Sequence, residues 1–255
     1  MSKKLAIYPS LSEKTVIVTG GASGIGAEIV WAFAKQGTKV GFIDLNADAS
    51  KQLANKLGEN VYFEICDLND ISAMKASINK LTTNIGPADI LVNNAASDDR
   101  HNWQDVTEDY WDERLSVNLR HQFFAIQHVA PGMIKKGGGS IVNIGSNSWW
   151  EAGGGFPAYA TAKSAVHGLT RTMARDLGQH RIRVNTVVPG WIMTERQKDL
   201  WVTPEGLENQ YKRQCLPDLI DPIYVARMVL FLASEGAEFS TGTIIDVNGA
   251  SHMRS

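Results

Sequence analysis

Cysteine and long apolar runs are both scarce in this sequence. Its 255 residues include two cysteines, Cys66 and Cys215, and such sparing use is typical of a reduced, cytoplasmic protein. No segment approaches the roughly 20 consecutive apolar residues that a membrane span requires. The first residues hold lysines but no apolar signal core, and Pro9 interrupts them. We therefore expect a cytoplasmic protein without a membrane partner.

An excess of charge of one sign is also missing. The 25 Lys and Arg residues nearly balance the 27 Asp and Glu residues, for a formal net charge of −2, so no field attracts nucleic acid. A chain of this length buries enough surface to fold without a disulfide or a structural metal, and we expect neither. No repeat or Pro/Ser-rich linker divides it, which predicts a single domain over residues 1–255.

What the sequence does have is a regular alternation of two kinds of segment. Short β-branched runs, mostly apolar on both faces, occur at 15–19, 39–44, 60–66, 89–93, 140–144, 183–188 and 243–247. Longer stretches with helical period include 25–36, 47–57, 71–82, 108–134 and 158–178. The alternation predicts an α/β protein of the Rossmann type: a doubly wound, parallel, seven-stranded sheet with helices on both faces. Ligands bind such sheets beyond the carboxyl ends of the strands.

A glycine-rich turn follows the first predicted strand. Gly20, Gly24 and Gly26 have the spacing G-x-x-x-G-x-G ahead of a helix, a variant of the dinucleotide-binding fingerprint. Glycine lets the backbone approach a pyrophosphate, and the helix N-terminus directs N–H groups at that anion. Ser23 and Ile25 share the turn and are expected to contact the cofactor. The alternative is a turn whose glycines serve only close packing of strand and helix.

An acidic residue ends the second predicted strand. Asp44 lies 18 residues after Gly26, near the spacing of about 20 at which a carboxylate accepts hydrogen bonds from the adenosine ribose. A carboxylate repels a 2′-phosphate, and neither Ser23 nor Leu45 supplies a cation that would attract one. We therefore predict NAD rather than NADP, with Asp44 and Leu45 at the adenosine. The alternative role for Asp44 is to cap the next helix.

Two further strand ends are expected to reach the cofactor. Asp67 and Leu68 follow the third predicted strand, where the carboxylate would lie beside the adenine. Asn94 and Ala95 follow the fourth, where small residues leave room for a ribose. Taken singly, each pair is equally consistent with a turn.

Three residues in the second half of the chain form a catalytic pattern. Ser146 follows the run at 140–144, and Tyr159 and Lys163 stand four apart in a helical stretch, so both project from one face. A free tyrosine has a pKa of about 10, and an ammonium one turn away is expected to lower it by stabilising the phenolate. The hypothesis is that Tyr159 takes a proton from a substrate hydroxyl that Ser146 holds. The Tyr–Lys pair alone is a weak signal; Ser146 and the glycine turn strengthen it.

Together these motifs resemble those of the short-chain dehydrogenase/reductase family, in the right order and over essentially the whole chain. They are Thr19-Gly20-x-x-x-Gly24-x-Gly26, Asn93-Asn94-Ala95-Ala96, Ser146 and Tyr159-x-x-x-Lys163. The resemblance implies that Tyr159 is the acid/base, that Lys163 binds the nicotinamide ribose and that Ser146 orients the reacting oxygen. Ala96 departs from the family, which more often has glycine there.

The same resemblance implies further roles. Asn118 is expected to complete a water-linked proton relay, and the nicotinamide is expected to contact Pro189, Gly190, Ile192 and Thr194. Family members usually form homotetramers through the helices that match 108–134 and 158–178, so a homotetramer is implied here as well.

Longer segments are similar to bacterial NAD-dependent D-xylose 1-dehydrogenases and related aldose 1-dehydrogenases. These segments are residues 6–11, 98–101, 110–114, 118–121 and 129–133. The similarity implies a sugar substrate, oxidised at its anomeric carbon to a lactone. Segment 151–157, with three consecutive glycines, departs from the xylose enzymes, and such space suits a larger or differently substituted sugar.

Several side chains are predicted to contact the sugar. Indole faces pack on sugar C–H faces and polar groups read hydroxyls; this makes substrate candidates of Ser146, Asn147, Ser148, Trp149, Tyr159 and Trp191. Core packing is the alternative for each Trp. Asp98, Arg100 and His101 fit a sugar contact, a solvated loop or a subunit contact.

Segment 194–215 is the predicted substrate lid, because it follows the nicotinamide loop and is rich in charge and Trp. Its Arg196, Lys198 and Arg213 either bind an anionic sugar substituent or form a solvated helix face.

Two other functions stay open. One is a dehydrogenase or reductase of another secondary alcohol or ketone, such as a deoxy-sugar acid or a 3-oxoacyl substrate. The other is a non-catalytic nucleotide-sensing protein. Asp44 argues against an NADPH-dependent reductase, and the complete set of Asn118, Ser146, Tyr159 and Lys163 argues against a sensor.

Overall fold

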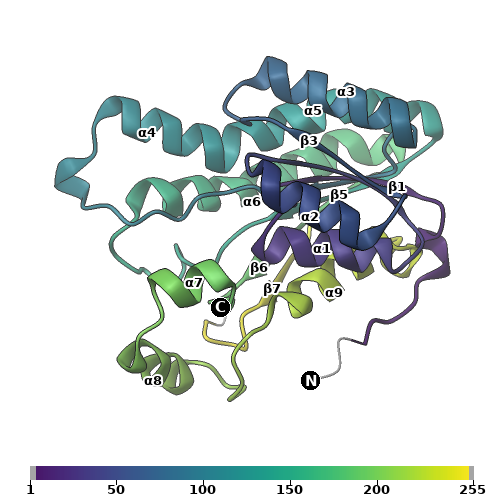
Figure 1. The fold of residues 1–255 in the computed structure, drawn as a ribbon. Coiled ribbons are helices and arrows are strands. Elements are labelled where there is room, and N and C mark those ends of the chain that lie inside the picture. The colour runs from purple at the N-terminus through teal and green to yellow at the C-terminus, as the bar shows by residue number, and fades with distance from the viewer. Residues whose placement is uncertain (1–3, 253–255) are drawn as a thin grey trace.

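The computed structural model describes residues 4–252, which contain one seven-stranded sheet (Figure 1). Residues 1–3 and 253–255 of the expected domain lie outside the described part. The strands, all parallel, are in the order β3-β2-β1-β4-β5-β6-β7. Their bounds are β1 Thr15–Thr19, β2 Lys39–Asp44, β3 Val61–Ile65, β4 Ile90–Asn93, β5 Gly139–Ile144, β6 Ile182–Pro189 and β7 Ile244–Val247. The predicted doubly wound architecture is confirmed.

Helices cover both faces of the sheet (Figure 1). One core packs beneath α1 (Gly24–Ala34), α2 (Ala47–Leu57) and α9 (Pro222–Ala233). The other packs beneath α3 (Ile71–Ile85), α5 (His121–Lys136) and α6 (Pro157–Leu177). Central strands are buried on both sides, as in β1, where all five residues are buried, and this explains why their sequences are apolar without alternation.

Four features were not expected from periodicity. The stretch at 108–134 divides into α4 (Glu108–Leu115), a π turn (Ser116–Arg120) and α5. Two short helices, α7 (Glu195–Leu200) and α8 (Pro204–Arg213), project beyond the sheet (Figure 1). Helix α9 is so largely buried that it shows little amphipathic pattern.

Residues 4–252 contain neither a membrane-spanning helix nor a cluster of metal ligands. No helix in that range is long and apolar enough to cross a membrane. No group of three or more His, Cys, Asp or Glu side chains in the same range is arranged to hold a metal ion.

Candidate active site

A cavity of about 1090 Å³ follows the carboxyl ends of the strands. It includes the switch point of the sheet, where β1 and β4 are neighbours and their connections run in opposite directions. Every predicted cofactor residue, from Gly20 to Thr194, lines this cavity. The predicted substrate residues also line it apart from Trp149, and the predicted catalytic residues apart from Asn118.

The glycine-rich turn opens one end of the cavity. Ser23 is the N-cap residue of α1 but makes no side-chain cap hydrogen bond in the described structure, which leaves the first N–H groups of the helix for an anion. Gly20 has a φ of +65°, and a Cβ on Gly26 would lie 1.8 Å from the Gly20 carbonyl oxygen. The glycines therefore serve close packing and, at the same time, bring bare backbone to the cavity, as a dinucleotide pyrophosphate requires.

Asp44, the last residue of β2, stabilises this turn by a hydrogen bond. Its carboxylate accepts hydrogen bonds from the backbone N–H groups of Ala22 (2.9 Å) and Asn46 (3.0 Å). The alternative role of Asp44 as a helix cap is wrong, because Asn46 is the N-cap of α2 and accepts from Ala49. Asp44 therefore places its carboxylate at the cavity wall.

The residues after β3 and β4 take part in turn hydrogen bonds and also line the cavity. Asp67 accepts from the backbone N–H of Asn69 at 2.9 Å and lines the cavity. The Asn94 side chain donates to the carbonyl oxygens of Thr19 (3.1 Å) and Gly20 (2.8 Å). It thereby ties the end of β4 to the glycine turn across the switch point.

Ser146, Tyr159 and Lys163 meet at the other end of the cavity. The Lys163 ammonium donates to the Ile144 carbonyl oxygen at 2.8 Å and lies 5.8 Å from the centre of the Tyr159 ring. The Ser146 hydroxyl accepts from the backbone N–H of Ser148 at 3.1 Å, and its own hydrogen bond to Tyr159 favours the phenolate. A phenol, an amine and a hydroxyl thus lie together at the cavity wall.

The pKa of Tyr159 moves in the direction opposite to the prediction. Desolvation raises it to about 12, with the Asp98 carboxylate adding to the rise, while Ser146 and Arg100 oppose it. Desolvation also lowers the pKa of Lys163 to about 8. Burial thus disfavours both the phenolate and the ammonium that the sequence pattern predicted to stabilise it.

Asn118 lies behind the cavity, in the π turn. Its side-chain oxygen accepts from the Ser97 backbone N–H at 2.9 Å, and its amide donates to the carbonyl oxygens of Ser97 (3.1 Å) and Arg114 (2.9 Å). Asn118 is fully buried. In the described structure its side chain therefore joins the segment after β4 to the end of α4.

The tryptophans divide between the cavity and packing. Trp191 lines the cavity and donates from its indole nitrogen to the Gln197 side chain at 3.0 Å. The Trp149 ring packs instead on Trp150 and His167, with ring centres 4.5 and 5.3 Å away. Trp149 is thus placed outside the cavity lining, in the packing role named as its alternative.

The three cations named in the predicted lid are each paired with a carboxylate. Arg196 lies 2.6 Å from Asp99, Lys198 lies 2.7 Å from Glu195, and Arg213 lies 3.3 Å from Glu151. All three cations are about half exposed and line the cavity, so a contact with an anionic sugar substituent and a solvated helix face both stay open.

Gln197 and Glu151 also line the cavity, but they were not predicted as site residues. Gln197 donates to Asp98 at 2.7 Å, and Glu151 accepts from Asn147 at 2.6 Å and from Ser251 at 2.9 Å. The partners lie up to 100 residues away in the chain, so no local motif could have indicated them.

A doubly wound sheet with a glycine turn at one end of its switch-point cavity and a Ser–Tyr–Lys set at the other is the architecture of a dinucleotide-dependent oxidoreductase. The family model described as enoyl-(acyl carrier protein) reductase matches residues 20–252. The chain belongs to the short-chain dehydrogenase/reductase family and is an oxidoreductase.

Individual relatives match nearly full length. D-xylose 1-dehydrogenase of Caulobacter vibrioides is 48% identical over 240 residues, 93% of this chain and 95% of that protein. A probable galactose dehydrogenase of Rhizobium meliloti is 44% identical over 246 residues, 95% of this chain and 96% of that protein. A solved 7α-hydroxysteroid dehydrogenase, complexed with NADH and 7-oxo glycochenodeoxycholic acid, superposes with a TM-score of 0.90 at 33% identity, covering 95% of this chain and 96% of that chain.

Proposed function

We propose that this enzyme oxidises an aldose sugar at the anomeric carbon to the lactone, with NAD as the oxidant. The observation that carries the proposal is the single cavity that joins the glycine turn and Asp44 to Ser146, Tyr159 and Lys163. Relatives named as xylose and galactose dehydrogenases support a sugar as the substrate.

The adenosine end favours NAD on electrostatic grounds. Asp44 offers carboxylate oxygens to ribose hydroxyls and repels a 2′-phosphate. The neighbouring Leu45 is apolar and 65% exposed, so it supplies no cation to hold such a phosphate. Asp67 and Leu68 would flank the adenine, and Pro189, Gly190, Ile192 and Thr194 would hold the nicotinamide.

At the reacting end, each residue has one task. When bound, oxidised nicotinamide supplies the hydride acceptor and a positive charge. Tyr159 receives the proton of the anomeric hydroxyl, and Ser146 holds the same oxygen by a hydrogen bond. That positive charge would lower the pKa of Tyr159 from the value of about 12 to which desolvation raises it. Lys163, with a pKa near 8, is poised to exchange the proton onward, and Asn118 would complete the relay.

The proposal also covers the lid, the sugar contacts, the location and the oligomeric state of the protein. Segment 194–215, which includes α7 and α8, forms the substrate lid, while Asn147, Ser148 and Trp191 contact the sugar. The protein acts in the cytoplasm as a homotetramer, for which light scattering would give four times the chain mass of 27.9 kDa.

The direct test is NADH formation at 340 nm across pentoses, hexoses and uronic acids, each measured with NAD and with NADP. We expect turnover with at least one neutral aldose and a preference for NAD. Turnover confined to 3-oxoacyl substrates or deoxy-sugar acids would replace the proposed substrate. Tight NADH binding without any turnover would favour the sensor.

A further inference from the structure

The helix that carries Tyr159 lacks a local cap. Helix α6 begins at Pro157, and its N-cap residue, Phe156, makes no side-chain cap hydrogen bond in the described structure. Tyr159 is the third residue of this helix, within its first turn. Three consecutive glycines lie just ahead, at 153–155, so local sequence restrains this turn weakly.

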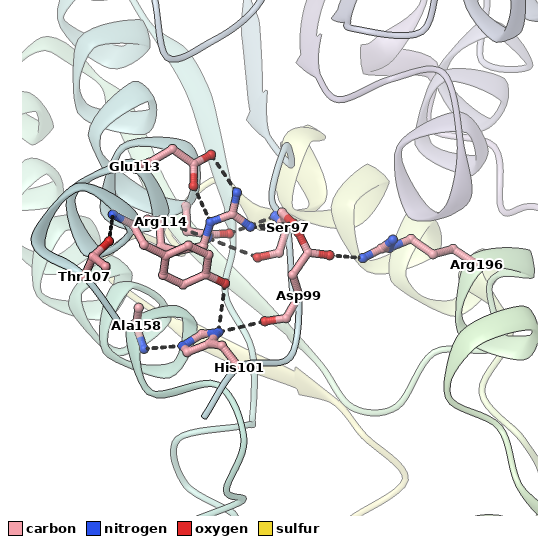
Figure 2. A network of polar contacts seen from close by, with 10 residues as sticks. Ser97, Asp99, His101, Thr107, Glu113, Arg114, Ala158 and Arg196 are labelled. Atoms are coloured by element: carbon pink, nitrogen blue, oxygen red, sulfur yellow. Dashed lines mark hydrogen bonds and ion pairs between the residues drawn. The ribbon is translucent and has the colours of Figure 1, made fainter. Parts of the chain in front are cut away.

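A residue from a distant loop supplies the missing acceptor. The backbone N–H of Ala158, the second residue of α6, donates to Nε2 of His101 at 3.3 Å (Figure 2). This N–H is one of those that a capping side chain normally satisfies. The imidazole of His101 therefore occupies the place of an N-cap side chain, 57 residues away in the chain.

Two neighbouring contacts hold the same turn. The backbone N–H of His101 donates to the Gly155 carbonyl oxygen at 2.8 Å. The Arg100 guanidinium lies 4.1 Å from the centre of the Phe156 ring. Residues 100 and 101 thus contact the chain both before and after the start of α6.

The ring of His101 is held in one orientation. Because Nε2 accepts a hydrogen bond, the neutral imidazole carries its proton on Nδ1. Nδ1 lies 3.0 Å from the Asp99 carbonyl oxygen and 3.0 Å from the Tyr110 hydroxyl (Figure 2). The Tyr110 ring also packs edge-on against the imidazole.

The other end of this loop is tied to Asn118. Ser97 exchanges backbone hydrogen bonds with the Asn118 side chain. The Asp99 carboxylate accepts from the Ser97 hydroxyl at 2.7 Å and from Arg114 at 2.9 Å. Residues 97–101 therefore span the distance between Asn118 and the helix start beside Tyr159.

We propose that His101 is a positioning residue: it caps α6 from a distance and so fixes the orientation of Tyr159 at the reacting oxygen. His101 acts through the backbone of Ala158 and takes no proton from the substrate. The inference rests on the proposed function, because it assigns His101 to the reaction in which Tyr159 is the base.

Two substitutions separate the cap from the other contacts of the ring. The side-chain oxygen of glutamine reaches the region of Nε2, whereas that of asparagine reaches only the region of Nδ1. We expect His101→Asn and His101→Ala to lower kcat about 10-fold, since small misplacements of a reacting group are costly, while the Kd for NADH stays within about 2-fold. His101→Gln should retain kcat within about 3-fold of the wild-type value.

Hydrogen–deuterium exchange gives a readout that does not depend on the substrate. The peptide covering the first turn of α6 should exchange faster in His101→Asn than in His101→Gln or the wild type. Equal kcat and equal exchange in the Asn and Gln variants would overturn the proposal. If the wild type oxidised no aldose, the proposed function would fail, while the exchange comparison would still test the cap.

Discussion

At the scale of single residues, Tyr159 and Lys163 show what a motif determines and what it leaves to packing. Their spacing predicted that both would project into one site, and both line the cavity. Their pKa values follow instead from desolvation, which raises that of Tyr159 and lowers that of Lys163. Desolvation depends on all the atoms that surround a group, so the sequence could not predict these directions.

Replacement of Tyr159 by phenylalanine removes the hydroxyl and leaves the ring. Because a positioned acid/base typically contributes about 10²- to 10⁴-fold, we expect kcat to fall by that factor. NADH binding, measured by fluorescence titration, should change by less than about 2-fold, because the ring is retained. A variant that kept most of its turnover would remove Tyr159 from the reaction.

Replacement of Asp44 tests the NAD preference. We expect Asp44→Ala and Asp44→Asn to lower the ratio of kcat/KM for NAD over NADP by at least about 10-fold, since hydrogen bonds to charged groups contribute roughly 1.5–3 kcal/mol. Asp44 accepts from the N–H groups of Ala22 and Asn46 with different oxygens, and asparagine keeps one of these two acceptors, whereas alanine keeps neither. The Asn variant therefore separates loss of charge from collapse of the turn. An unchanged ratio in the Asn variant would show that the charge of Asp44 does not discriminate between NAD and NADP.

Site residues adjoining a strand end were the predictable ones. Asp44 ends a strand, Gly20 and Ser146 come just after one, and strand position alone brings all three to the cavity. Trp149 shows the limit of that rule, since it also follows β5 but packs on His167. Composition indicates that an indole is present but not which way its ring turns.

At the scale of elements, the proposed lid is linked to the segment after β4. Arg196 and Gln197 of α7 contact Asp99 and Asp98 at 2.6 and 2.7 Å. The pKa of Asp99 is lowered first by the Ser97 hydroxyl and then by Arg114 and Arg196, against the effect of burial. Asp99 therefore stays charged and available to the lid. Charge and Trp content predicted a lid here. They could not predict which residues of the lid would contact Asp98 and Asp99, because the partners lie 97 and 99 residues apart in the chain.

The Arg196 pair should matter for substrate retention. It crosses from α7 to the loop after β4, but both side chains are about half exposed, and such pairs contribute up to about 1 kcal/mol. We expect Arg196→Gln to raise the KM for the sugar about 3-fold with kcat nearly unchanged.

A matched control exists within the same segment. Lys212 pairs with Glu208 inside α8, at 2.6 Å, so Lys212→Gln removes one cation without detaching the lid. Its KM should stay at the wild-type value in initial-rate assays. If both variants raised KM equally, net charge rather than the crossing contact would be responsible.

Helix boundaries were predictable where a capping signal is local. Asp70 caps α3 by accepting from Ala73, next to the predicted start at residue 71. The π turn at Ser116–Arg120 carries no such signal, because it keeps helical periodicity on both sides. Asn118 within this turn hydrogen-bonds to the segment after β4 and to α4, and neither contact could be read from local sequence.

At the scale of the whole molecule, the sheet was predictable because its strands are buried on both faces. The two cores, one on each side, require apolar residues at consecutive strand positions. Helix α9 was missed for the same physical reason. Its burial against the sheet removes the polar face by which periodicity identifies a helix.

His121 is a buried titratable group that should make the stability of the whole fold depend on pH. His121, the first residue of α5, is fully buried, and burial with help from nearby Lys163 lowers its pKa to about 3. In the unfolded chain a histidine titrates near 6.5. Between these values the unfolded state binds more protons than the folded state, so the stabilising contribution is complete above pH 6.5 and is lost as pH falls toward 3.

We therefore expect His121→Gln to reduce the acid sensitivity of the fold. The difference in unfolding free energy between wild type and variant should shift in favour of the variant by roughly 1 kcal/mol for each pH unit below about 6. Urea unfolding at pH 7, 6, 5 and 4.5, at one protein concentration, would measure it. His180→Gln, in the turn Gly178–His180 that follows α6 and contains no buried residue, serves as the matched control for replacing a histidine. A gap between His121→Gln and wild type that did not change with pH would mean that His121 is protonated within the fold, and would place the acid sensitivity elsewhere in the molecule.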